Sequence, residues 1–186
     1  AGVVGCGLGW NEDTKFLVYE LIRKSKIPLV IDADGINVIS DNINILKESK
    51  SQIILTPHLK EMSRLLKLDI KTIKRDRVKY ALQISKKYKV TVVVKGPQSV
   101  ICDECGNVFV NTSGNVGLAK GGSGDVLSGM IGSLLGQKMT AVDAAVCGVF
   151  LHGLSGDKCK ERYSSVSTIP SDIINELPNI FAEFKM

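Results

Sequence analysis

Short apolar runs alternate with longer segments of helical periodicity along this chain of 186 residues. Buried strands are predicted at 28–31, 52–55 and 90–94, where Val, Ile and Leu lie between polar or turn-forming residues. Helices are predicted between these strands, and such alternation specifies a parallel sheet covered on both faces. We therefore expect an α/β fold with three layers and a mostly parallel central sheet.

Capping residues and turn signals predict the other elements. Helices are expected at 11–23, 36–46, 60–66, 72–88, from the end of a glycine-rich segment to 135, at 140–155, and after a cap at Ser171-Asp172, with Pro178 ending or bending the last one. Residues 99–102 and 108–110 look like a strand pair. No repeat, linker or low-complexity tract interrupts the pattern, so we expect one domain over residues 1–186. Because Val3-Val4 reads as a strand already under way, we also expect that N-terminal sequence is missing.

The glycine-rich segment lies directly before an apolar helix. Five glycines between Gly114 and Gly124 fall within 11 residues, and Asp125 follows them. Backbone N–H groups in such a loop approach an anion closely, and the helix dipole favours negative charge at the same point. A polyphosphate repels a carboxylate there unless the carboxylate holds a metal ion or takes a proton from an attacking hydroxyl. The segment predicts a phosphoryl-transfer site with Asp125 as its catalytic residue.

Polar residues also follow the predicted strands, where ligands bind in open α/β sheets. Asp32-Ala-Asp34 either binds a metal or caps the next helix, and both interpretations stay open. Lys95, in Lys95-Gly-Pro-Gln-Ser99, either contacts phosphate or is a solvated strand-end lysine. His58 is expected at the binding edge, against the alternative of an exposed loop histidine. His152, between apolar neighbours, is expected to be a core histidine with its hydrogen bonds satisfied.

Composition and charge narrow the function. The net charge of +5 comes largely from residues 60–89, with eleven Lys and Arg, which we interpret as solvated helix faces rather than a nucleic-acid site. Only 5% of residues are aromatic. No long apolar run or signal peptide is evident, so we expect a cytoplasmic protein without a membrane contact. Five irregularly spaced cysteines favour free thiols, and Cys102-x-x-Cys105 favours a turn between strands over a metal site.

Two common nucleotide motifs are excluded. Gly5-Cys-Gly-Leu-Gly9 lacks the spacing of a G-x-G-x-x-G dinucleotide fingerprint, and no Walker A sequence is present. By itself the Gly5–Gly9 segment is either a structural turn or a ligand contact.

Taken in order, these motifs resemble those of the ADP/ATP-dependent NAD(P)H-hydrate dehydratases, a carbohydrate-kinase-like family of the ribokinase-like fold. The counterparts are Gly5-Cys-Gly-Leu-Gly9, Asp32-Ala-Asp34, Leu55-Thr-Pro-His58, Lys95-Gly96 and Thr112-Ser-Gly-Asn-Val-Gly-Leu-Ala-Lys-Gly-Gly-Ser-Gly-Asp-Val-Leu127. Cys6 replaces the family's usual proline, and members usually carry several dozen further residues before this point. The resemblance runs from residue 3 to about 178 and implies a ribokinase-like three-layer α/β/α fold that lacks its N-terminal portion.

The resemblance also implies an activity, the dehydration of the S epimer of hydrated NADH or NADPH through a phosphorylated intermediate. ADP or ATP would donate the phosphoryl group, with Mg²⁺, in a homo-oligomer that is a tetramer. The hydrated dinucleotide would contact Gly9, His58 and Asp125, and no residue is assigned to a metal. The nucleotide would contact Lys95, Gly96, Pro97, Gln98, Ser99, Asn115, Val116, Gly117, Leu118, Ala119, Lys120, Gly121, Gly122, Ser123 and Gly124. Two other functions stay open: a ribokinase-like kinase of a vitamin-precursor alcohol, and a non-catalytic nucleotide-binding module.

Overall fold

A six-stranded sheet in the order β1-β2-β3-β4-β5-β6 forms the centre of the computed structural model, which describes residues 1–184. The parallel strands are β1 (Gly2–Val4), β2 (Leu29–Ile31), β3 (Ile53–Leu55) and β4 (Thr91–Val94). β5 (Val100–Cys102) and β6 (Val108–Val110) extend the sheet as an antiparallel hairpin. The expected mostly parallel sheet is confirmed.

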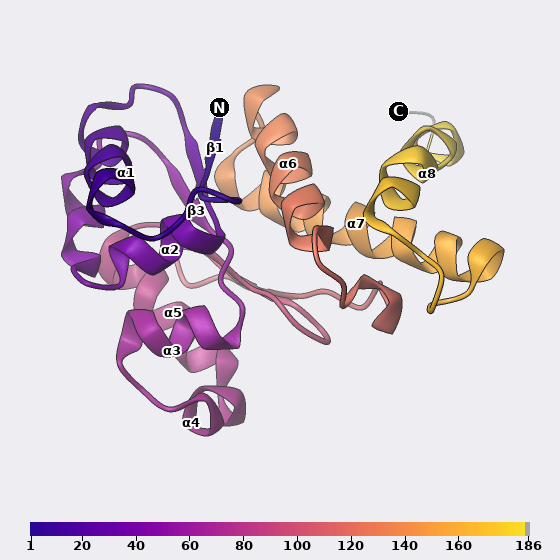
Figure 1. Ribbon diagram of the computed structural model, residues 1–186, viewed down its shortest axis with the longest axis horizontal. Helices are drawn as coiled ribbons and strands as arrows, with labels where there is room; N and C mark the ends of the chain where they lie inside the picture. Colours follow the sequence, from indigo (N-terminus) through magenta and orange to yellow (C-terminus); the bar gives the residue numbers. More distant parts are fainter. Residues whose placement is uncertain (185–186) are drawn as a thin grey trace.

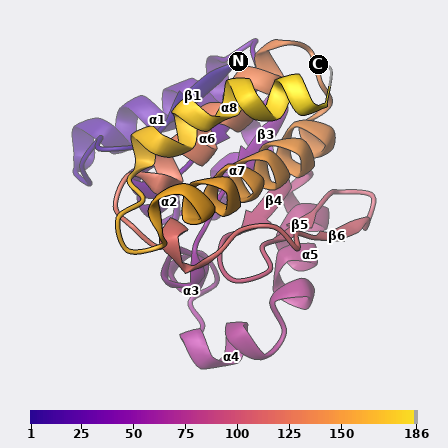
Figure 2. The same cartoon turned by 90° about the vertical axis from the view of Figure 1, so that its right-hand side faces the viewer.

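Helices cover both faces of this sheet (Figures 1 and 2). Those that connect the parallel strands are α1 (Glu12–Lys24), α2 (Ala33–Ile39), the 3-10 helix η1 (Ile43–Glu48), α3 (Leu59–Leu66), α4 (Ile70–Arg75) and α5 (Arg77–Tyr88). The hairpin is followed by the 3-10 helix η2 (Val116–Leu118), α6 (Ser123–Gly136), α7 (Ala141–Tyr163) and α8 (Pro170–Glu183). Crossovers between parallel strands are right-handed, so connections between strands in consecutive order all lie on one face. The opposite face is left for α6 and α7, which completes the three layers.

Two apolar cores follow from the alternation of side chains along the strands. Val30, Ile54, Val93 and Ile101 pack against α6 and α7. Their neighbours on the same strands, such as Ile31, pack against the helices of the other face. Each such side chain contributes about 1.5–3 kcal/mol when fully buried. The sheet is therefore held between its helical layers by apolar contacts on both sides.

Two predicted helices are each broken in the structure. The helix expected at 36–46 is instead α2 and η1, because Ser40 donates from its hydroxyl to the carbonyl of Asn37 at 2.6 Å and ends the first helix. The helix expected at 72–88 is α4 and α5. Asp76 has φ −148° between them, and its carboxylate caps α5 by accepting from the N–H of Lys79.

The last two helices also differ from the prediction. α7 continues eight residues past the expected end at 155, to Tyr163, and α8 passes through Pro178. Pro178 is exposed, so water can satisfy the carbonyl that a proline leaves without a partner. Asp172 caps α8 as expected by accepting from the N–H of Ile169 at 2.9 Å, but the helix begins at Pro170, before Ser171.

The turn at Cys102–Cys105 and the exposure of the basic helices agree with the sequence-based predictions. The Cys102–Cys105 segment is the β5–β6 turn, held by the Asp103 carboxylate, which accepts from the backbone N–H of Asn107 at 2.8 Å. Five basic residues in and beside α3 to α5 are exposed, as expected of solvated helix faces: Arg64, Lys67, Lys74, Lys79 and Lys86. Among the described residues no helix is both long and apolar enough to cross a bilayer.

Candidate active site

Asp32 lies at the centre of the candidate site, at the end of β2, and is 1% exposed. Its Oδ1 accepts from the N–H of Ala33 at 2.8 Å and from Lys95 Nζ at 2.5 Å. Its Oδ2 accepts from the Ser128 hydroxyl of α6 at 2.6 Å. Asp32 therefore caps α2 and pairs with Lys95, so the capping interpretation is confirmed. Lys95 likewise is a partly buried ion-pair partner rather than a solvated lysine.

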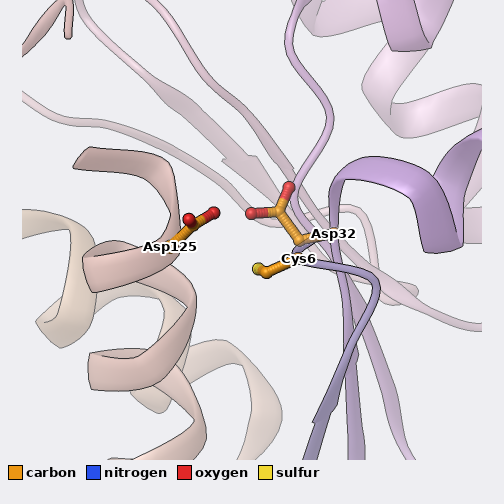
Figure 3. Close-up of side chains that lie close together, drawn as sticks. All are labelled: Cys6, Asp32 and Asp125. Atoms are coloured by element: carbon orange, nitrogen blue, oxygen red, sulfur yellow. The ribbon is translucent and has the colours of Figure 1, made fainter. Parts of the chain in front are cut away.

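Asp125 approaches Asp32 from the opposite layer. It is the third residue of α6, is exposed, and follows Gly122, whose φ of 86° makes the turn into the helix. Ligand atoms of Cys6, Asp32 and Asp125 all lie within 4.8 Å of one another. Figure 3 shows the three side chains pointing toward a common centre. The two halves of the chain thus meet at this point.

Cys6 is a neutral thiol beside the Asp125 carboxylate. Burial raises the pKa of Cys6 to about 12, helped by a hydrogen bond to Asp125 and by the negative charges of Asp32 and Asp125. The thiol is the donor in that bond, because it keeps its proton. Cys6 therefore lies beside the carboxylate that the sequence predicts to be catalytic.

The cluster of Cys6, Asp32 and Asp125 does not fit a magnesium site. Mg²⁺ prefers octahedral oxygen ligands and keeps several waters. A protonated thiol is not such a ligand, and both oxygens of Asp32 already accept hydrogen bonds.

The glycine-rich loop is tied to α7 at its start. Asp157 of α7 accepts from the N–H of Gly114 at 2.7 Å and from Asn115 Nδ2 at 2.9 Å. Asn115 Oδ1 in turn accepts from the N–H of Gly117 at 2.9 Å. The side chain of Asn115 thus shapes the loop from within. Further along, Lys120 Nζ donates to the carbonyls of Val166 and Thr168, both at 2.5 Å.

The end of the loop leaves backbone donors open. Within residues 1–184, the N–H groups of Gly121, Gly122 and Gly124 have no protein acceptor. The last of these is in the first turn of α6, where the positive end of the helix dipole adds to the attraction for an anion. A Cβ at Gly124 would lie 3.5 Å from Lys95 Nζ, so the ammonium is beside these donors. This arrangement can hold a phosphate group.

Ser123, between those donors, is fixed by His152. The ring nitrogen Nε2 lies 3.0 Å from the Ser123 carbonyl and 3.2 Å from its hydroxyl. A carbonyl accepts only, so Nε2 carries the proton. Burial lowers the pKa of His152 to about 4 and keeps the ring neutral. The expected core histidine is confirmed, and it also anchors the start of α6.

The turn from Lys95 to Ser99 borders the same space. The N–H of Lys95 donates to the carbonyl of Pro57 at 2.8 Å. Arg77 Nη1 donates to the carbonyl of Pro97 at 2.9 Å, and the Ser99 hydroxyl donates to the carbonyl of Gly96 at 3.1 Å. Gly96, Pro97 and Gln98 are exposed, so this turn is accessible to a ligand.

His58 is the N-cap of α3. Its Nδ1 accepts from the N–H of Glu61 at 3.1 Å, and Glu61 Oε2 accepts from the N–H of His58 at 2.7 Å. Burial, the largest cause, lowers the pKa of His58, which agrees with an unprotonated Nδ1. The 3.4 Å separation between Nδ1 and Glu61 Oε2 is therefore not an ion pair. His58 is 48% exposed and offers its remaining ring nitrogen to a ligand.

Gly9 completes the sequence-predicted set, on the turn after β1. Its N–H donates to Asp34 Oδ2 at 2.9 Å, and its φ of 80° favours glycine. Asp34 thus fixes the Gly5–Gly9 turn.

The structure brings together Asp125, Lys95 and the open donors of the glycine loop, and places Gly9 after β1 and His58 after β3, with β2 between them. Sequence reasoning did not assign site roles to Cys6, Ser128, Arg77 and Asp157. Ser128 could have been found from the sequence, because it lies three residues after Asp125 and therefore on the same face of the helix. Asp157 could not be placed from the sequence, because the helix predicted at 140–155 ends before it.

A family model described as NAD(P)H-hydrate dehydratase matches residues 1–179. The chain belongs to the NAD(P)H-hydrate dehydratase family. Among curated relatives, the ADP-dependent (S)-NAD(P)H-hydrate dehydratase of Neisseria meningitidis is 40% identical over 165 residues, which cover 87% of this chain and 55% of that protein. The bifunctional NAD(P)H-hydrate repair enzyme Nnr of Thermofilum pendens is 39% identical over 94% of this chain and 33% of that protein. The chain thus spans a third to about half of the length of these relatives.

Solved structures of similar proteins show the same fold. The ADP/ATP-dependent NAD(P)H-hydrate dehydratase of Bacillus subtilis, co-crystallised with ATP/Mg²⁺ and soaked with CoA, has a TM-score of 0.87 at 27% identity, covering 98% of this chain and 65% of that one. A ribokinase-like superfamily protein of Enterococcus faecalis has a TM-score of 0.84 at 26% identity, covering 98% of this chain and 62% of that one. The expected ribokinase-like fold is confirmed.

Proposed function

We propose that this dehydratase-family chain catalyses the ADP- or ATP-dependent dehydration of the S epimer of NAD(P)H-hydrate, a repair of damaged nicotinamide nucleotides. The observation that carries the proposal is the position of Asp125. Its exposed carboxylate is in the first turn of α6, beside the open N–H donors of the glycine loop and within 4.8 Å of ligand atoms of Cys6 and Asp32, which follow β1 and β2.

Each side of the site has a role in the proposed reaction. Asp125 takes the proton from the hydroxyl of the hydrate, and the hydroxyl oxygen attacks the terminal phosphorus of the nucleotide. The bond from this phosphorus to the rest of the nucleotide breaks, so the nucleotide leaves with one phosphate fewer. The N–H groups of Gly121, Gly122 and Gly124, with the dipole of α6, stabilise charge on the transferring phosphoryl group. Loss of phosphate from the ring carbon, with a proton from the neighbouring carbon, then restores the dihydronicotinamide.

The nucleotide site comprises the Lys95–Ser99 turn and the Asn115–Gly124 loop. Lys95 Nζ has the position to approach a phosphate from the side of Asp32. Mg²⁺ would enter with the phosphates, since the side chains here offer it no preformed cage. The five free cysteines suit a reducing compartment, so we place the reaction in the cytoplasm. The family resemblance supports a homo-oligomer.

The test is Asp125→Asn in the full-length protein. Turnover of hydrated NADPH, followed by recovery of NADPH absorbance, should fall about 10²–10⁴-fold, because a general base contributes about that much. Nucleotide binding by calorimetry should be largely kept, since Asp125 acts on the transition state rather than on the bound nucleotide. Unchanged turnover would exclude the role of Asp125. Phosphorylation of a vitamin-precursor alcohol without turnover of the hydrate would exclude the dehydratase in favour of a kinase.

A further inference from the structure

A series of hydrogen bonds leads away from the reacting centre, from Gly9 to Arg64. The N–H of Gly9 and Asn37 Nδ2 donate to the two oxygens of Asp34, at 2.9 and 3.1 Å. Arg64 Nη1 donates to Asn37 Oδ1 at 2.6 Å. Because these bonds join the turn after β1 to α2 and α3, they hold an exposed guanidinium in one orientation.

Trp10 lies under that guanidinium. The Arg64 guanidinium carbon is 5.5 Å from the centroid of the indole ring, a cation–π geometry. Trp10 nevertheless remains 52% exposed, directly after Gly9. Within residues 1–184 the other N–H groups of the Arg64 guanidinium have no protein acceptor. An aromatic face and a set of free, planar donors are therefore presented to solvent side by side.

The Trp10–Arg64 pair is continuous with the active site. The turn that ends at Trp10 begins beside Cys6, whose thiol contacts Asp125. Burial is the main reason that the pKa of His58 is lowered, and the positive charges of Lys95 and Arg64 lower it further, so Arg64 is near enough to act on that imidazole. One short turn therefore leads from the catalytic carboxylate to the exposed pair.

A dinucleotide needs such a second contact region. Beyond its hydrated nicotinamide, the substrate carries a diphosphate, an adenosine and, in the NADPH form, a 2′-phosphate. Aromatic side chains bind bases by stacking, and arginine binds phosphate through paired N–H groups. The pair has both properties at one end of the site.

We propose that Trp10 and Arg64 form the subsite for the adenosine-phosphate half of the hydrated dinucleotide, with the indole stacked against the base and the guanidinium bonded to a phosphate. The inference rests on the proposed function, from which it takes its ligand. Arg64 is then a binding residue and not a catalytic one, so its substitution should change KM rather than kcat.

The first test compares Arg64→Gln with wild type on hydrated NADPH, hydrated NADH and hydrated reduced nicotinamide mononucleotide, which lacks the adenosine half. Arg75→Gln, an exposed arginine on α4, is the matched control. Arg64→Gln should raise KM for a dinucleotide about 10- to 100-fold, the usual effect of losing a charged hydrogen bond, with kcat unchanged. A rise for hydrated NADPH alone assigns the 2′-phosphate, and an equal rise for both dinucleotides assigns the diphosphate. Unchanged KM for both, or an equal rise for the mononucleotide, would overturn the subsite.

The second test does not depend on turnover. Trp10 is the only tryptophan of the chain, so intrinsic fluorescence reports on this one position. The product NADPH should quench its emission at lower concentrations in wild type than in Arg64→Gln. Unchanged emission at NADPH concentrations that inhibit turnover would contradict the subsite. Quenching by NADPH without turnover of any hydrate would contradict the proposed dehydratase and leave the subsite standing.

Discussion

Glu61 is a buried carboxyl group that the site holds close to Asp32 and Lys95. Burial raises its pKa from 4.5 to about 7, against the N–H of His58 and the charge of Lys95, which lower it. A raised pKa means that the folded protein keeps the proton longer than the unfolded chain. The stabilisation is therefore fully present below pH 4.5 and is lost as the pH rises through about 7.

Glu61→Gln removes this titration and keeps an oxygen for the N–H of His58. We expect the variant to match wild type near pH 4 and to have a larger free energy of unfolding at pH 8, by up to about 3 kcal/mol. Urea unfolding at several pH values measures the difference, with the exposed Glu12→Gln as control. A constant difference across the range would contradict the raised pKa.

At this scale the sequence predicts residues that end strands or begin helices. Asp125, Lys95 and His58 could be predicted as site residues because a strand end or a glycine run precedes each of them. For Asp32 the sequence left two roles open, a metal ligand or a helix cap. Its burial and its bonds to Lys95 and Ser128 could not be predicted, because they join residues 63 and 96 positions apart. The pairing of Arg64 with Trp10 is hidden for the same reason.

Helices α6 and α7 pack closely through small residues. A Cβ at Gly148 would lie 2.6 Å from Ile131 Cγ1, whereas a Cβ at Gly129 of α6 would meet nothing within 4 Å. Both glycines are helical, so the two positions separate packing from helix propensity.

Gly148→Ala should therefore lower the free energy of unfolding by about 1–3 kcal/mol through overpacking, while Gly129→Ala should raise it by about 0.5–1 kcal/mol. Denaturant unfolding of both variants measures the contrast. Similar changes in the two would mean that the helices separate without cost.

At the scale of elements, the existence of the helices could be predicted from periodicity. The predicted helix boundaries are wrong where a side chain such as Ser40 or Asp76 bonds the nearby backbone.

The ion pair of Asp32 and Lys95 joins different parts of the whole molecule, because Ser128 of the opposite layer bonds the same carboxylate. Lys95→Met would leave a buried charge without its partner and should cost about 3–5 kcal/mol of stability. Adding Asp32→Asn, which keeps a good capping residue, should recover much of that loss. Unfolding in urea of the two single variants and the double variant gives the coupling. Additive losses would show that the pair does not act as a unit.

The consecutive strand order has a consequence for recombination between relatives. All strand ends of the site, including Lys95 after β4, come before the β5–β6 turn, and Asp125, Ser128 and the glycine loop come after it. A chimera joined at the β5–β6 turn would inherit the two sides of its site from different parents. Such a protein closes its site only if both parents match at the pairs Cys6–Asp125 and Asp32–Ser128, so the gene can be exchanged in blocks only where these distant positions are exchanged together.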